Sequence, residues 1–171
     1  TNYPNLDLLC ADTSYRNLDL RLHELDKPQK GLRRAIKPLR GDYDYVLLDC
    51  PPGMSLLSEN VLTAAHAVVV PVIPTPLSVR TLEQLHDFIR KKGFEVQVLP
   101  FFSMVDRRKK LHKETMEELS RRYSEFLHTA IPYASDIEQM GLHRAPVATY
   151  AGWTEGARNY RTLWGEILDR L

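Results

Sequence analysis

Two runs of consecutive apolar residues limit the folds open to this 171-residue chain. Tyr45–Asp49 begins Tyr-Val-Leu-Leu, and Ala67–Val72 begins Ala-Val-Val-Val, without alternating polar residues. A strand covered on both faces has this composition, so both runs predict buried strands of a parallel sheet. Three further short runs also predict strands: Leu6–Ala11, Val96–Phe102 and Thr129–Ile131.

Helical patterns separate these runs. They cover Gly31–Leu39, Ser58–Ala65, Val79–Lys92, Leu111–Leu127 and Thr154–Leu171. In the third, Ser78 is a plausible N-cap, and Gly93 follows the last helical residue. Strands that alternate with helices predict an α/β fold with three layers, in which helices cover both faces of a mostly parallel sheet. We expect residues 1–171 to form one domain.

Composition excludes several classes of protein. The formal net charge is +1, so binding to nucleic acid or to an anionic membrane would need a local basic patch. Two cysteines, Cys10 and Cys50, make no disulfide framework and indicate reduced, buried thiols in a cytoplasmic protein. No run of eighteen apolar residues occurs, so no membrane span is predicted. The first residue is Thr1 rather than Met, which suggests that the sequence begins mid-protein.

Asp49 is the residue most suited to chemistry. Ligands of open α/β sheets bind beyond the carboxyl ends of the strands, and Asp49 ends an apolar run. A carboxylate there can hold Mg²⁺, directly or through water, beside nucleotide phosphates. Pro51 and Pro52 stiffen the exit from the strand, and Gly53 permits an unusual backbone angle. From these residues alone, an Asp that caps a turn or a helix is an equal alternative.

The segment Tyr43–Gly53 resembles the YDyviiDtPPg motif of the ParA/MinD family of partition and positioning ATPases, which are P-loop NTPases. The resemblance continues through Leu56–Ala65, Ala67–Ser78 and Met104–Arg108, and then through Ile131, Pro132 and residues 141–147. The blocks keep the family's order and approximate spacing over most of the chain, which makes the match more specific than any one block.

The resemblance implies a role for several residues. It implies that the complete protein binds ATP and Mg²⁺, forms a homodimer around the nucleotide, and is regulated by a ParB-like or other partner protein. Asp49 would hold Mg²⁺ through water. Ser103 and Pro132 would face the base, although the family often has Asn at the position of Ser103, and Ser cannot make the paired amide contact. The switch that senses the γ-phosphate would comprise Pro51, Pro52, Gly53, Ser55 and Asn60.

The family's phosphate-binding loop, of the type KGGxGK[ST], does not occur in these residues. Leu6–Ala11 resembles the family's third strand, so we expect an N-terminally truncated ParA-like domain that lacks the P-loop strand and helix and does not hydrolyse ATP alone. A degenerate, non-enzymatic scaffold is the alternative. A further alternative is a relative such as a cobyrinic acid a,c-diamide synthase or a cellulose-synthesis accessory ATPase, although nothing here resembles a glutaminase domain.

One basic run, Arg107, Arg108, Lys109 and Lys110, has two interpretations. ParA-like dimers hold DNA non-specifically through surface cations, and this run is where the resemblance would place such a contact. The competing interpretation, which we favour, is a solvated helix start whose charge is balanced by nearby acids. Those acids are Glu114, Glu117 and Glu118.

Overall fold

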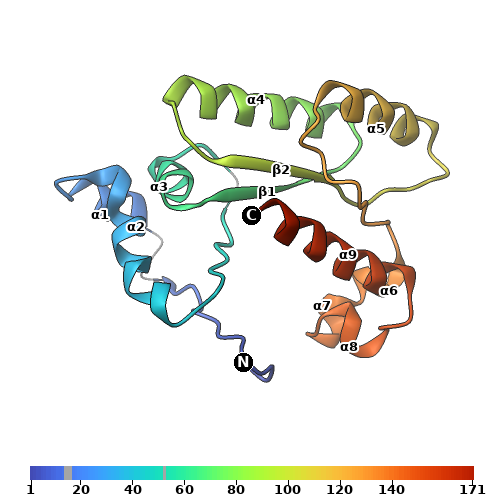
Figure 1. Ribbon diagram of the computed structural model, residues 1–171, viewed down its shortest axis with the longest axis horizontal. Coiled ribbons are helices and arrows are strands. Elements are labelled where there is room, and N and C mark those ends of the chain that lie inside the picture. The colour runs from blue at the N-terminus through green and yellow to red at the C-terminus, as the bar shows by residue number, and fades with distance from the viewer. Residues whose placement is uncertain (14–16, 52) are drawn as a thin grey trace. The chain divides into compact units, whose positions relative to one another are not determined.

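The computed structural model describes residues 1–13, 17–51 and 53–171. It divides into two compact units, Thr1–Ala64 and Ala65–Leu171, each described here by itself (Figure 1). No helix in the described residues is both long and apolar enough to cross a membrane.

A parallel strand pair forms the centre of the second unit. Strand β1 (Ala67–Val72) pairs with β2 (Gln97–Phe102), with Ala67 opposite Gln97 and Val72 opposite Phe102. Helix α4 (Pro76–Lys92) makes the crossover between them. The strands predicted at Ala67–Val72 and Val96–Phe102 are thereby confirmed.

A third segment extends this pair without becoming a full strand. The Ile131 N–H donates to the Phe102 carbonyl at 2.8 Å, and a parallel bridge joins Val105 to Pro132. The prediction of a strand at Thr129–Ile131 is therefore wrong. Its backbone still lies beside β2, but regular pairing is limited to one bridge because the chain turns into α6 (Ser135–Glu138) soon afterwards.

Helices cover both faces of the sheet in this unit. Figure 1 shows α4 and α5 (Lys110–Arg122) on one side of the strands and α9 (Glu155–Arg170) on the other. Alternate residues of β2 supply the two cores, because successive side chains of a strand point to opposite faces. The core on the α4 and α5 side contains Val72, Leu82, Phe102, Val105, Leu119 and Phe126. The core on the α9 side contains Leu99, Phe101, Leu127, Ile131, Leu163 and Ile167.

Local chemistry sets the helix ends. Helix α4 starts after Thr75 with Pro76 in its first turn, so the expected cap, Ser78, lies inside the helix instead. The helix ends at Gly93, whose φ of +69° suits a residue without a side chain. Helix α5 ends at Arg122, earlier than the predicted Leu127. The Leu127 N–H donates to the Pro100 carbonyl at 2.8 Å, which draws this segment onto the sheet.

Short helices α7 (Met140–His143) and α8 (Val147–Tyr150) complete the second unit. The first unit is built from short helices. They are α1 (Leu18–His23), the 3₁₀ turn η2 (Pro28–Lys30), α2 (Gly31–Ile36), the 3₁₀ turn η3 (Lys37–Gly41) and α3 (Leu56–Ala64). The helices predicted at Gly31–Leu39 and Ser58–Ala65 therefore form.

Two predicted strands of the first unit are wrong. Leu6–Ala11 and Tyr45–Asp49 have irregular backbone, and Leu9 and Leu47 are 90% and 77% exposed. An apolar run becomes a buried strand only where a neighbouring strand pairs its N–H and C=O groups and other layers cover its faces. The first unit has no strand among its described residues, so neither condition is met there.

Candidate functional site

The segment that ends at Asp49 is open to solvent. Asp49 itself is exposed, and so are Cys10 and Cys50, so the prediction that the two cysteines are buried is wrong. The Cys50 thiol donates to the Leu48 carbonyl at 3.2 Å. Desolvation raises the pKa of the Cys50 thiol, and the neighbouring Asp49 charge raises it further, so this thiol stays protonated at neutral pH. Gly53 has a φ of +135°, which a residue with a side chain rarely adopts. Pro52, the other predicted switch residue of this turn, lies outside the described residues, whereas Pro51 is described and exposed.

Ser55 lies at the start of α3, where Asp19 of α1 provides a carboxylate. The Asp19 Oδ1 accepts the Leu57 N–H at 2.8 Å and the Ser55 hydroxyl at 3.3 Å. An acidic group at the N-terminal end of a helix accepts a hydrogen bond from a free N–H and interacts favourably with the positive end of the helix dipole. Sequence reasoning missed Asp19 because it is 38 positions from Leu57, and no local motif marks such a contact.

Asn60 is fully buried and makes three hydrogen bonds. Its Nδ2 donates to the carbonyls of Pro28 at 2.8 Å and Leu56 at 2.9 Å, while its Oδ1 accepts the Leu32 N–H at 3.1 Å. Both amide hydrogens are thus engaged within the first unit. The side chain fastens η2 and the start of α2 to α3.

Ser103 and Pro132 meet on neighbouring segments at the carboxyl end of β2. The Ser103 N–H donates to the Val72 carbonyl at 3.0 Å, which continues the ladder between the strands. Pro132 faces Val105 across the isolated bridge. Pro132 lines a cavity of about 390 Å³, whose wall does not include Ser103. Its other lining residues are Val105, Arg107, His112, Lys113, Met116, Glu117 and Ala130.

The loop between β2 and α5 is tied by internal contacts. The Asp106 carboxylate accepts bonds from Nε and Nη2 of Arg108, each at 3.0 Å, and from the Arg108 backbone N–H. The hydrogen bonds from the Arg108 side chain are the main reason that the pKa of Asp106 falls to about 2. The buried His112 accepts the Asp106 N–H through Nδ1 at 3.1 Å. Sequence reasoning did not single out His112.

Ion pairs neutralise most of the predicted basic run. Arg107 pairs with Glu155 at 3.1 Å, Arg108 pairs with Asp106, and Lys110 pairs with Glu114 at 3.3 Å. Of the acids expected to balance the run, Glu114 does so directly. These pairs support the interpretation of a solvated helix start.

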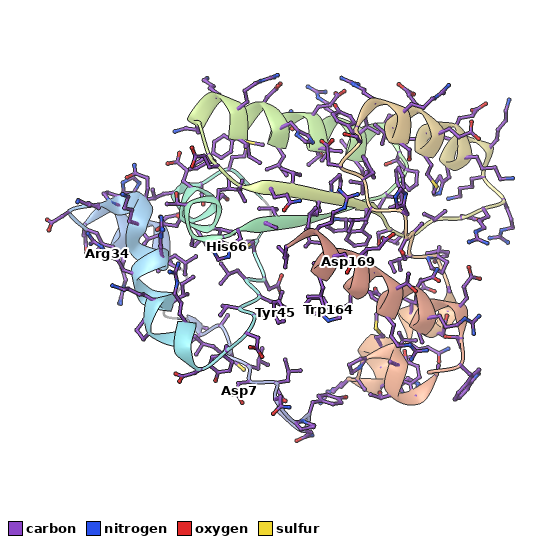
Figure 2. All side chains as sticks on the ribbon, in the orientation of Figure 1. Asp7, Arg34, Tyr45, His66, Trp164 and Asp169 are labelled. Carbon is purple, nitrogen blue, oxygen red and sulfur yellow. The ribbon has the colours of Figure 1, made fainter. Side chains whose placement is uncertain are left out.

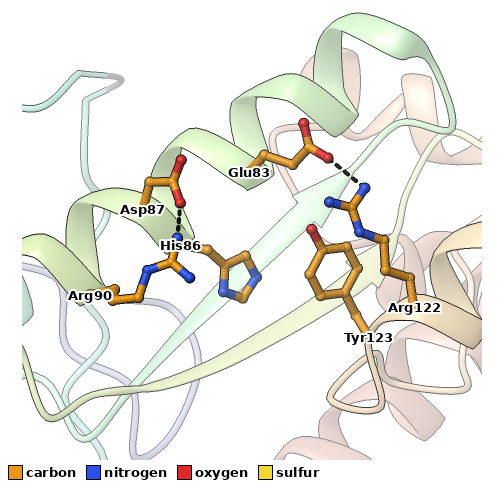
Figure 3. A pocket seen from close by; sticks show the side chains of 6 residues that line it. All are labelled: Glu83, His86, Asp87, Arg90, Arg122 and Tyr123. Carbon is orange, nitrogen blue, oxygen red and sulfur yellow. Dashed lines mark hydrogen bonds and ion pairs between the residues drawn. The ribbon is translucent and has the colours of Figure 1, made fainter.

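A second cavity, of about 510 Å³, lies between α4 and the residues that end α5 (Figure 3). Its charges are matched within its own wall: Arg122 pairs with Glu83 at 2.6 Å, and Arg90 pairs with Asp87. His86 stacks on Tyr123 with ring centres 5.2 Å apart. We interpret these contacts as polar packing between α4 and the residues that end α5.

No cluster of metal-binding side chains in the described part of the chain includes Asp49. The described residues contain no group of three or more His, Cys, Asp or Glu side chains that could hold a metal ion. Mg²⁺, however, is commonly bound by one or two carboxylates together with waters and substrate phosphates. A single exposed carboxylate therefore fits the part of a magnesium site that nucleotide phosphates complete.

The similarity of this chain to known proteins covers almost its whole length. Residues 1–97 match the profile of an AAA domain family. The chromosome partitioning protein ParA of Caulobacter vibrioides is 30% identical over 99% of this chain, which spans 67% of that protein.

Two solved structures share the fold. A plasmid partition protein from Borrelia burgdorferi superimposes with a TM-score of 0.73 at 16% identity, over 94% of this chain and 61% of that one. The cobyrinic acid a,c-diamide synthase of Mycobacterium smegmatis, with bound ADP and magnesium, gives 0.70 at 25% identity, over 89% and 57%. The chain thus spans less than two thirds of both solved proteins.

A parallel sheet between helical layers, with polar side chains at the carboxyl ends of its strands, places the chain among the α/β nucleotide-binding folds. With the profile match and the ParA similarity, the chain belongs to the ParA/MinD-type family of P-loop ATPases.

Proposed function

We propose that this chain is the larger part of a ParA-type ATPase that binds Mg-ATP, dimerises around it, and acts in chromosome or plasmid partitioning or a related positioning process. The observation that carries this proposal is the 30% identity to Caulobacter ParA across 99% of the chain. A similarity of that extent includes both the Asp49 turn and the Pro132 loop. It is therefore more specific than a shared fold alone.

In this proposal Asp49 holds Mg²⁺ through water, and the ion would neutralise charge on the nucleotide phosphates. The turn of Pro51, Pro52 and Gly53, together with Ser55, forms the switch. Asn60 acts as a positioning residue, because its amide already bonds to the Pro28 and Leu32 backbone. A movement of α3 would thereby be passed to the segment that Asn60 holds.

Ser103 and Pro132 face the base in this proposal. This assignment is supported by the hydrogen bond from Ser103 to Val72 and by the bridge between Val105 and Pro132, which bring both residues to one edge of the sheet. A serine hydroxyl offers one donor, whereas an asparagine amide would offer a donor and an acceptor side by side. We therefore expect weaker discrimination between adenine and guanine than an Asn would give.

The proposed partners are a second copy of the protein and a ParB-like or other regulatory protein, in the cytoplasm. We assign no nucleic-acid contact to Arg107–Lys110, since most of that run is internally paired. The 171-residue chain alone is not expected to hydrolyse ATP, because it contains no KGGxGK[ST] loop whose backbone N–H groups would bind the phosphates.

A non-enzymatic scaffold is the second candidate. It is favoured by the exposed apolar residues of the first unit, such as Leu8 and Leu9, which offer a surface to another chain. A synthase is a third candidate, supported by the structural similarity to the Mycobacterium smegmatis enzyme.

The coding sequence directly upstream of Thr1 separates the ATPase from the scaffold. An in-frame KGGxGK[ST] loop favours the ATPase, and its absence from the gene favours the scaffold. In the product of a gene with that loop, Asp49→Asn should lower Mg-dependent ATP hydrolysis at least tenfold, while the matched control Asp44→Asn leaves it within about twofold. Equal activity of both variants would remove Asp49 from the magnesium site.

A further inference from the structure

Trp153 is the most exposed of the described Trp, Tyr and Phe residues, at 76%. It lies in the turn of residues 151–154, which joins α8 to α9 in the second unit (Figure 1). A single exposed apolar side chain is common on protein surfaces, so exposure alone assigns it no role. The surroundings of this indole are what distinguish it.

The backbone that carries Trp153 is held in place by its neighbours. The Ala151 carbonyl accepts the Thr154 N–H at 3.1 Å and the Thr154 hydroxyl at 2.9 Å. A Cβ on Gly152 would lie 2.7 Å from the Ala148 carbonyl oxygen, so the turn also packs closely on α8. The indole is therefore presented from an ordered backbone, which lowers the entropy cost of binding a partner.

Two arginines of α9 lie beside this turn. Nη1 of Arg158 donates to the Trp153 carbonyl at 2.5 Å, and Nη2 of Arg161 donates to the carbonyl of the preceding residue at 2.9 Å. Both arginines are exposed, and neither forms an ion pair with another described residue. The acid that starts α9, Glu155, pairs with Arg107 instead. A guanidinium group has five N–H donors, so most donors of each arginine remain available to an outside acceptor.

We call Trp153, Arg158 and Arg161 the indole–arginine surface. Tryptophan and arginine are enriched among the residues that contribute most to protein interfaces. The fork of a guanidinium group matches a carboxylate, to which it can donate two parallel hydrogen bonds. Two cations beside one apolar side chain are thus complementary to a peptide in which carboxylates flank an apolar residue.

Other polyanions fit this surface less well. A membrane surface needs a broader apolar face or a second anchoring signal, and a nucleic-acid duplex needs a longer row of cations. We propose that the indole–arginine surface binds an acidic peptide segment of another protein, with the apolar side chain of that segment packed on Trp153. This inference depends neither on ATP binding nor on the Asp49 turn.

The test is a ¹H–¹⁵N NMR titration of the full chain with three synthetic peptides, EDELDEE, EDEFDEE and EDEWDEE, at 50 mM NaCl. The chain has two tryptophans and hence two indole N–H signals, which Trp153→Ala assigns. Trp164, the other tryptophan, lies farther along α9 (Figure 2). At least one acidic peptide should shift the Trp153 signal and leave the Trp164 signal in place. The same peptides with Lys in place of every acid should shift neither.

Variants measure what each side chain contributes. Trp153→Ala should weaken binding at least tenfold, because it removes the apolar anchor. Its matched control, Leu77→Ala, removes an apolar side chain of the same 76% exposure at the start of α4 and should bind within about twofold of the wild type. Arg158→Gln should weaken binding about threefold. Its control is Arg121→Gln, which removes an arginine that also donates to a backbone carbonyl, that of Glu117 at 3.1 Å, and should leave binding unchanged.

Thermal unfolding by circular dichroism checks that the variants remain folded. Should Trp153→Ala lose its fold, the shift of the wild-type indole signal decides alone. Vesicles that contain 30% phosphatidylserine and a 30-base-pair duplex test the other polyanions. The inference is overturned if no acidic peptide at 1 mM shifts the Trp153 signal, if acidic and basic peptides shift it equally, or if Trp153→Ala and Leu77→Ala lose equal affinity. Binding to vesicles or duplex that depends on Trp153, without binding of any acidic peptide, overturns it as well.

Discussion

Replacing Asn60 by alanine should loosen the first unit. The change leaves the Leu32 N–H and the Pro28 carbonyl without the partners that lie 3.1 Å and 2.8 Å away in a fully buried position. Each unsatisfied buried group costs about 1–3 kcal/mol, and the better helix propensity of alanine returns about 0.6 kcal/mol. Two such groups cost about 2–6 kcal/mol, so we expect a net loss of about 1.4–5.4 kcal/mol in the stability of this unit.

Hydrogen–deuterium exchange measured by mass spectrometry reports this loss locally. A destabilisation of that size should speed amide exchange of residues 28–36 at least about tenfold, because each 1.4 kcal/mol is a factor of ten. Peptides from α4 in the second unit serve as an internal reference. The control Thr63→Ala removes a single hydroxyl contact within α3, to the Glu59 carbonyl at 2.7 Å, and should change exchange by less than about fivefold. Equal exchange in Asn60→Ala and Thr63→Ala would refute the positioning role.

Substitutions at two glycines should change the free energy of unfolding in opposite directions, and a substitution at Asp106 should change it in a pH-dependent way. Gly31→Ala should destabilise the chain by about 1 kcal/mol, because its Cβ would meet two leucine methyl groups. Gly165→Ala, in the interior of α9 with open space around it, should instead stabilise the chain by about 0.5–1 kcal/mol. Urea unfolding measures both changes, and a change of the same sign in both variants would contradict the packing around Gly31. The pKa of Asp106 is lowered to about 2, so its ionised form stabilises the native state above its unfolded pKa of about 3.9. The stability difference between wild type and Asp106→Asn should accordingly stay constant from pH 5 to 7 and shrink as pH falls from 4 towards 2, and a difference independent of pH down to 2 would count against the ion pair.

Much of the second unit could be predicted from local patterns. The runs at Ala67–Val72 and Val96–Phe102 became strands because the helix between them returns the chain to the same sheet. Gly93 marked the end of α4 correctly, since only a left-handed backbone fits there. These elements depend on contacts between consecutive segments, which periodicity and end signals describe well.

Two helices of the first unit could be predicted in this way, but its irregular segments and long-range contacts could not. An apolar run such as Tyr45–Asp49 shows that a segment can be buried, but not that a partner strand is present to bury it. The contacts of Asn60 with Pro28 and Leu32 join residues 32 and 28 positions apart, and no spacing rule links them. The same holds for Asp19 at the start of α3. Long-range hydrogen bonds of this kind depend on how short helices pack, which a sequence pattern does not encode.

The central claim is that Asp49 supplies one part of a magnesium–nucleotide site whose phosphate-binding loop is not among these 171 residues. The most direct measurement is release of radiolabelled phosphate from ATP by the purified chain, with and without Mg²⁺, beside Asp49→Asn. The account predicts that both proteins stay at the background of a reaction without protein. Mg-dependent hydrolysis by the wild type that Asp49→Asn abolishes would contradict it, because the chain would then hold a complete catalytic site.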